Sequence, residues 1–223
     1  MTTEPAWEPA PVPEVADMFR RAETPWWIAG GHAIELAVGH PIREHDDVDV
    51  LVLRDDQLAV QHVLAGWEWW AADPPGTLRP WQPDEYLHRG IHDIWCRPGP
   101  GTPWRLQIML DEAQDGLWVS RRDTAVHRPV EELGAVSANG IPYVTPEVQL
   151  YYKAKNPRPK DETDLAAALP SLAPAQRIWL ATAILETYGA HPWVDQLDVP
   201  EQYRRPPQKD LLDDLPYDWE QRR

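Results

Sequence analysis

The sequence predicts an α+β protein in which a mixed β-sheet with flanking helices is followed by a small helical segment. Two observations place the sheet in the first half. The apolar stretch 26–29 ends in a glycine pair followed by a helical pattern, and the run 48–53 is β-branched and leucine-rich, as in a strand covered on both faces. The third observation is that helical spacing dominates beyond residue 144, so the helical segment begins there.

Length and composition bound the class of protein. The chain has 223 residues and 43% hydrophobic residues, which suffice for one large domain with a buried core. Its net charge of -15 repels phosphate backbones, so nucleic acid is a disfavoured partner, whereas a small cation is attracted. An acidic, proline-rich beginning and the lack of a long apolar run favour a cytoplasmic protein without a membrane span.

The first half divides into an arm and a core. Residues 1–13 contain four prolines and few residues that would pack, so we expect a flexible arm, and residues 14–144 form the expected core. Hydrophobic spacing and turn residues give its elements. We expect helices over 14–21, 33–38 and 56–65, and strands over 26–29, 48–53, 67–71, 91–97 and 104–110, the last two joined as a hairpin by PGPGTP.

The second half is predicted to be helical. Thr145 is a candidate N-cap before Pro146, and this helix runs to Asn156 and Pro157. Two more helices are expected over 161–169 and 175–188. The helical C-terminal segment therefore covers 145–195, and residues 196–223 are expected to form a charged, frayed tail.

Two aspartates occupy alternate positions at the start of the central strand. Asp47 and Asp49 lie two residues apart, so in a strand both project from the same face and repel each other. Hard divalent cations relieve such repulsion, and a pair of Mg²⁺ ions stabilises the attacking and leaving oxygens of a phosphoryl or nucleotidyl transfer. Gly30 and Gly31 carry no Cβ, so a triphosphate is able to approach the backbone where the next helix begins.

This stretch resembles the nucleotidyltransferase superfamily of the DNA polymerase β type, and within it the aminoglycoside 2''-adenylyltransferases and lincosamide nucleotidyltransferases. The similarity implies that Asp47 and Asp49 are catalytic and hold Mg²⁺, and that Gly30 and Gly31 bind the nucleoside triphosphate. A weaker resemblance covers YYKAKNPRPKDETDL and places Lys153 at the outer phosphates. The matching residues are Trp27, Ile28, Gly30, Gly31, Ala33, Ile34, Gly39, Arg43, His45, Asp46, Asp47, Val48 and Asp49.

Three further side chains have open interpretations. His32 follows the glycines and either contacts the nucleotide or has no such role. Arg43 either forms a salt bridge with Asp46 or Asp47 or contacts phosphate. Lys153 belongs to the dense basic cluster of residues 153–160. This cluster either contacts the phosphates or is a solvated helix end.

The predicted function is Mg²⁺-dependent transfer of AMP, or another nucleoside monophosphate, from ATP or another triphosphate to a hydroxyl of a small molecule. The resemblance and the charge of -15 favour an aminoglycoside acceptor and hence antibiotic resistance. A toxin-like enzyme acting on tRNA or protein, and a degenerate nucleotide-binding module, remain alternatives. Relatives generally supply a third carboxylate where this chain has Gln107, and Asp93 is its candidate replacement if the two residues share a sheet face.

Overall fold

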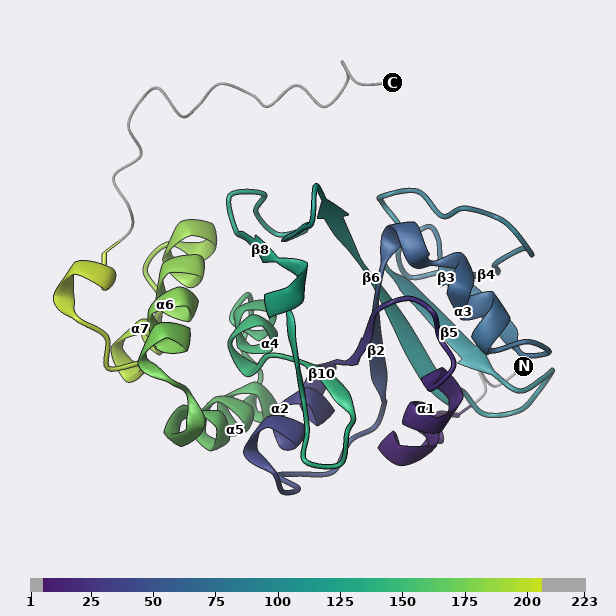
Figure 1. Cartoon of the computed structure of the whole chain (residues 1–223), viewed down its shortest axis with the longest axis horizontal. Coiled ribbons are helices and arrows are strands. Elements are labelled where there is room, and N and C mark those ends of the chain that lie inside the picture. Colours follow the sequence, from purple (N-terminus) through teal and green to yellow (C-terminus); the bar gives the residue numbers. More distant parts are fainter. Residues whose placement is uncertain (1–5, 206–223) are drawn as a thin grey trace, which may run out of the picture.

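A computed structural model describes residues 6–205 (Figure 1). Its central feature is a mixed sheet with the strand order β4-β3-β5-β6-β2-β1-β10-β9. Outside this order, β7 pairs with the last residues of β6, and β8 pairs with β7. The predicted α+β class is confirmed. The strands are β1 Trp26–Ile28, β2 Asp49–Leu53, β3 Glu68–Ala72, β4 Leu78–Pro80, β5 Asp93–Arg97, β6 Leu106–Gln114, β7 Leu117–Val119, β8 His127–Pro129, β9 Gly134–Val136 and β10 Pro142–Val144.

The helices lie on both faces of this sheet, and most of them belong to the second half of the chain. No helix in the described part is both long enough and apolar enough to cross a membrane. The α-helices are α1 Val12–Phe19, α2 Gly30–Val38, α3 Leu58–Val63, α4 Pro146–Lys153, α5 Pro159–Ala168, α6 Pro174–Tyr188 and α7 Pro192–Gln196, and the 3₁₀ turns are η1 Arg54–Asp56, η2 Val130–Glu132, η3 Leu169–Ser171 and η4 Glu201–Tyr203.

Alternation along β2 divides the interior into two cores. Val50 and Val52 point into a core shared with α1 and α3, whereas Leu51 and Leu53 point into a core shared with α2, α4, α5 and α6. Figure 1 shows the two groups of helices on either side of β2 and β6. The C-terminal helices therefore share a hydrophobic core with the sheet and do not form a separate body.

The hairpin and the parallel pairings set the position of Asp49. The predicted hairpin is confirmed, because β5 and β6 are antiparallel neighbours. β2 runs parallel to β6 and antiparallel to β1, so it is central and covered on both faces, as its composition indicates. The strands β7 to β10 between residues 117 and 144 were not predicted individually, because each is a three-residue segment with too short a pattern to read.

Both predicted ends need correction in their described parts. Residues 6–10 are not a loose arm: the N–H of Glu8 donates to the Trp104 carbonyl at 3.0 Å, Ala10 is buried, and α1 begins at Val12. Residues 196–205 are not frayed, since Leu197 lies in the core and η4 follows it. Main-chain pairing and apolar burial outweigh the prolines there. Residues 1–5 and 206–223 lie outside the described part.

Helix boundaries also differ in small ways. α3 begins at Leu58, two residues after the predicted start, because residues 54–56 form the 3₁₀ turn η1. α5 begins at Pro159, two residues before the predicted start, since the Asp161 carboxylate accepts the N–H of Arg158 at 3.0 Å and so satisfies the residue before the helix. Thr145 occupies the N-cap of α4, but its hydroxyl accepts from Arg128 and makes no cap hydrogen bond.

Candidate active site

Asp49 opens β2, and the strand fixes the direction of its side chain. It pairs with Gln107 of β6, and its carbonyl accepts a 2.8 Å hydrogen bond from the N–H of Ala29. By alternation the carboxylate lies on the face of Leu51, toward α2 and the C-terminal helices. Asp47 lies two residues earlier, half-buried and just outside the strand.

The surroundings of Asp49 disfavour its charged form. Burial is the largest cause, the carboxylates of Asp47 and Asp93 add to it, and the pKa of Asp49 rises to about 7. Lys153 and Lys160 oppose this rise. Three carboxylates and two ammonium groups therefore act on one another at the start of β2.

Gly30 is required by its contact with Asp49. Its φ is +66°, and a Cβ built on it would lie 2.3 Å from Oδ2 of Asp49. Its N–H donates to Oε1 of Gln149 at 2.9 Å, which ties the start of α2 to α4. Gly31 is equally crowded, because its Cβ would lie 2.3 Å from both Arg43 and His45. These contacts explain the glycine pair by packing, and its predicted role in binding a triphosphate stays a prediction.

Asp93 lies next to the position of the missing carboxylate. It pairs with Met109 and Gln107 pairs with Trp95, so Asp93 and Gln107 are diagonal neighbours on one face and are not directly opposed. Nε2 of Gln107 donates to Oδ1 of Asp93 at 3.0 Å. Since Asp49 pairs with Gln107, the side chains of Asp49, Gln107 and Asp93 share the same face.

Lys153 is held by two aspartates of α5. Its Nζ lies 3.0 Å from Oδ1 of Asp161 and 2.9 Å from Oδ2 of Asp164, and only 8% of its side chain is exposed. Although burial acts in the opposite direction, hydrogen bonds from Arg158 and Lys153 hold the pKa of Asp161 well below its usual range. Lys153 thus fixes α4 against α5, and its predicted contact with phosphate remains untested.

Lys160 is the basic residue near Asp49 that has no ion pair or hydrogen bond among the described residues. It is half-buried in the first turn of α5, and its charge lowers the pKa of Asp49. The sequence placed Lys160 in the basic cluster but favoured Lys153, because the resemblance aligns Lys153 with the first lysine of related segments. The partners that neutralise Lys153, Asp161 and Asp164, act only once α5 packs on α4.

Arg43 does not pair with Asp46 or Asp47, so the expected salt bridge is wrong. Its Nε and Nη2 each lie 2.9 Å from the Asp164 carboxylate, in a bidentate pair. These residues are 121 positions apart, so local sequence gives no signal of the contact. The hydrogen bond from Arg43 and the charge of Lys153 hold the pKa of Asp164 low against the effect of burial.

His32 lies against His45 and Glu35. The two imidazole rings have centroids 3.9 Å apart, and Nδ1 of His32 lies 3.4 Å from Oε2 of Glu35. Burial and the neighbouring His45 lower the pKa of His32. Sequence reasoning missed Glu35, although its spacing of three residues from His32 places both on one face of α2.

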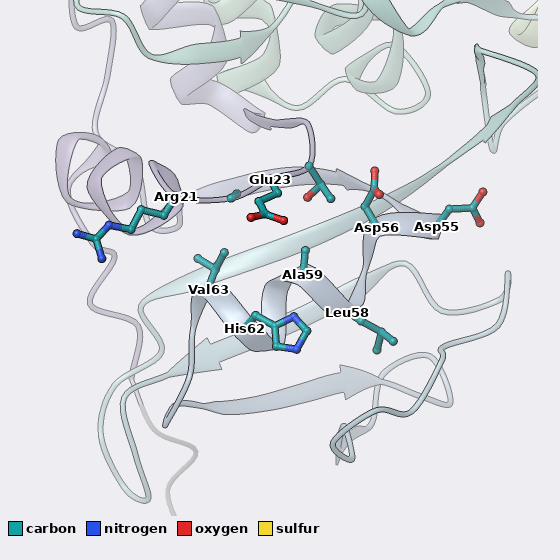
Figure 2. A pocket seen from close by; sticks show the side chains of 10 residues that line it. Arg21, Glu23, Asp55, Asp56, Leu58, Ala59, His62 and Val63 are labelled. Carbon is teal, nitrogen blue, oxygen red and sulfur yellow. The ribbon is translucent and has the colours of Figure 1, made fainter.

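A separate cavity of about 500 Å³ lies at the other end of β2. Figure 2 shows Asp55 and Asp56, which follow that strand, together with Glu23 and with His62 of α3 around it. Burial and the Asp55 charge raise the pKa of Asp56. Since β2 spans roughly 13 Å from Asp49 to Leu53, this cavity is not part of the carboxylate site.

Comparison with known proteins finds a match over the segment that contains the candidate site. Residues 12–73 match the family model described as aminoglycoside-2''-adenylyltransferase, a range that includes both glycines, Asp47 and Asp49. The predicted resemblance to the nucleotidyltransferases is confirmed. The match also supports the predicted enzyme class. Asp93, Gln107 and the C-terminal helices lie outside the matched range, so their roles in a nucleotidyltransferase depend on the contacts described above.

Three solved structures are similar to the chain, each at 16% identity. They are ANT(2'')-Ia in complex with adenylyl-2''-tobramycin (TM-score 0.45, covering 77% of this chain and 95% of that one), the lincosamide antibiotic adenylyltransferase LnuA with lincomycin bound (0.48, 72% and 97%), and the antibiotic-resistance factor ANT(2'')-Ia in solution (0.46, 76% and 87%). No curated protein sequence matches the chain.

Replacing Asp49 by asparagine is expected to stabilise the metal-free protein in a pH-dependent way. Because the folded pKa is about 7 and the ordinary value 3.8, the charged form is penalised only in the folded state, increasingly as the pH rises from 4 to 7. Asp49→Asn should raise the free energy of unfolding by ~1–3 kcal/mol at pH 8 and by little at pH 4.5. Thermal unfolding in chelator measures this, with the exposed Asp46→Asn as a control. A pH-independent difference would contradict the origin given for the shift.

We expect Lys153 to contribute to the stability of the fold and Lys160 to the binding of the nucleotide. Lys153→Ala leaves Asp161 and Asp164 short of a partner and should cost about 3–5 kcal/mol of stability. Lys160→Ala should leave the melting temperature unchanged but weaken binding of ATP more than of AMP, because AMP lacks the outer phosphates. Calorimetric titrations test this, with the exposed Lys155→Ala as the matched control. Equal weakening of both nucleotides by Lys160→Ala would contradict the phosphate contact.

Proposed function

We propose that the protein transfers AMP, or another nucleoside monophosphate, from a triphosphate to a hydroxyl of a small-molecule acceptor in a Mg²⁺-dependent reaction. One observation carries the proposal: Asp49 lies beside the Gly30 turn with Asp47 and Asp93 nearby, and burial together with these two charges raises the pKa of Asp49. These three carboxylates outnumber the two lysines that act on Asp49, Lys153 and Lys160. Divalent cations supply the further positive charge that the carboxylates and the phosphates of a triphosphate require.

The carboxylate set fits Mg²⁺ by its chemistry. Asp47 and Asp49 offer hard oxygen ligands at alternate positions of the chain, and no thiol or imidazole is part of this pair. Bound Mg²⁺ would neutralise charge on the transferring phosphoryl group. Two ions are the expected number. Asp49 is the more constrained ligand, because Gly30 and the pairing with Gln107 fix its position.

The first turn of α2 is the proposed phosphate-binding element. The first N–H groups of a helix have no partner within it, and of these the N–H of Gly30 already donates to Gln149. The N–H groups of Gly31 and His32 remain for phosphate oxygens, assisted by the helix dipole. Lys160 and Lys153 add positive charge near Asp49.

Transfer proceeds by attack of the acceptor hydroxyl on the α-phosphorus. A new O–P bond forms, the bond from the α-phosphorus to its bridging oxygen breaks, and pyrophosphate leaves. The hydroxyl proton passes to the Asp93 carboxylate, since Gln107 cannot accept it. The hydrogen bond from Gln107 holds one oxygen of Asp93 and leaves the other for this role.

The acceptor is proposed to be an antibiotic with amino groups, of the aminoglycoside class. The net charge of -15 attracts polycations, and the family match carries the name of an aminoglycoside-modifying activity. The sheet face beyond Gln107 bears Trp95 and then Trp70, directly paired across β5 and β3 and both half-buried. Both rings pack against Trp104, and their exposed parts are the apolar surface proposed for one face of a sugar ring.

A tRNA or protein substrate receives less support. A polyanion needs a basic surface, and the cluster of residues 153–160 is the candidate for one. Within it, Lys153 and Arg158 are both paired with Asp161, so much of the positive charge is neutralised locally.

The carboxylate assignment predicts the loss of transfer in two variants. Asp47→Asn and Asp49→Asn should each reduce pyrophosphate release by at least about 100-fold with saturating Mg²⁺, because each removes a metal ligand but keeps the side-chain shape. The assay uses ATP with a panel of aminoglycosides and lincosamides, and Asp46→Asn is the exposed control. Wild-type turnover in either variant would refute the metal assignment.

Asp93 is expected to replace the missing third carboxylate. Asp93→Asn should reduce AMP transfer at least tenfold, and adding Gln107→Asp to that variant should recover part of the rate. Both residues share one face and are hydrogen-bonded, so a carboxylate at either position lies near the same point. If Asp93→Asn has no effect while Gln107→Asp alone raises the rate, the site is a weakened one that lacks its base.

A further inference from the structure

His32, Glu35 and His45 form a compact set of ligand atoms apart from the Asp47 and Asp49 carboxylates. One nitrogen or oxygen from each of the three side chains lies within 4.8 Å of the others. We refer to these three residues as the histidine–glutamate cluster. His32 and Glu35 are one turn apart on α2, and His45 belongs to the loop that leads to Asp47.

The contact between His45 and Glu35 is not an ordinary hydrogen bond. Nε2 of His45 lies 2.9 Å from Oε1 of Glu35, yet this nitrogen has no hydrogen-bond partner and its side chain is only 6% exposed. Oε1 already accepts the N–H groups of Ile42 at 2.8 Å and Arg43 at 3.3 Å. A buried ring nitrogen without a well-aligned partner is costly, and a cation bound between Nε2 of His45 and the Glu35 carboxylate would satisfy both groups.

The spacings match those around a transition-metal ion. Ligand atoms about 2.0–2.2 Å from one ion, at angles of about 90–110°, lie about 2.9–3.4 Å apart. The two oxygens of Glu35 have contacts within this range, 2.9 Å from Oε1 to Nε2 of His45 and 3.4 Å from Oε2 to Nδ1 of His32, so the carboxylate is placed to bind an ion through both oxygens. The two backbone N–H groups that hold Oε1 orient the carboxylate, as outer hydrogen bonds do in established metal sites.

Space for further ligands is present beside the cluster. His32 and Glu35 line a cavity of about 280 Å³ between the end of α2 and residues 137–139. Water molecules are able to fill the remaining coordination positions from that side.

We propose that the histidine–glutamate cluster binds one transition-metal ion, of the class of Zn²⁺ or Co²⁺, through His32, Glu35 and His45. Two imidazoles and one carboxylate suit these ions and not Mg²⁺, which prefers oxygen ligands. The ion joins α2 to the loop before Asp47, so it fixes the carboxylate that follows this loop. The proposal does not depend on the function proposed above.

Cobalt binding tests the proposal directly. The full chain, without a polyhistidine tag and freed of metal by chelator, is used in an Asp47→Asn/Asp49→Asn background so that the carboxylates contribute little. Titration with CoCl₂ should give one bound Co²⁺ per chain with visible absorption bands. Adding His32→Gln should abolish the bands, whereas adding His62→Ala, which removes an exposed histidine elsewhere, should leave them unchanged.

Zinc provides an independent measurement. Zn²⁺ should displace the cobalt bands and, at a free concentration 100 times its Kd, raise the melting temperature of the background chain by about 5–10 °C. Mg²⁺ at millimolar concentration should do neither. Absence of Co²⁺ binding by the background chain overturns the proposal, and so does binding that His32→Gln leaves intact. Because the background chain itself must bind, failure of a variant to fold does not rescue the proposal.

Discussion

The close contact between the Gly30 backbone and the Asp49 carboxylate is the constraint on which the site depends. Any side chain at residue 30 would occupy the position of Oδ2 of Asp49, and the φ of +66° disfavours such a side chain independently. The same residue donates its N–H to Gln149. One glycine therefore sets the distances between the start of α2, the start of β2 and α4, and the sheet and the C-terminal helices meet there.

The charges of α4 and α5 link these helices to the candidate site on the sheet. The sheet contributes carboxylates, with Asp49 penalised by burial and by its acidic neighbours, and α4 and α5 bring Lys153 and Lys160 toward it. Lys153 is itself fixed by Asp161 and Asp164. Buried ion pairs of this kind add little net stability compared with apolar packing, but breaking one is costly, so they fix the geometry of the helices more than they stabilise the fold.

Local patterns predicted the elements around the candidate site, and long-range packing determined what those patterns missed. The glycine pair, the alternate aspartates and the apolar strand are signals within a few residues, so β1, α2 and β2 followed from them. The partner of Arg43 lies in α5, and the preference for Lys160 over Lys153 depends on which lysine α5 neutralises. The short strands from 117 to 144 form because β6 and β1 offer edges to pair with, which no short pattern reveals.

Gln107 shows how a departure from the family pattern fits this charge arrangement. A carboxylate at this position would lie beside Asp49 on one strand and Asp93 on the next, adding a fourth negative charge to a group that already raises the pKa of Asp49. The amide instead donates a hydrogen bond to Asp93 and fixes its orientation. With Asp93 present, glutamine lowers the repulsion without removing the third carboxylate. Asp93 and Gln107 therefore form one hydrogen-bonded unit, in which the proposed base lies on the strand next to Gln107.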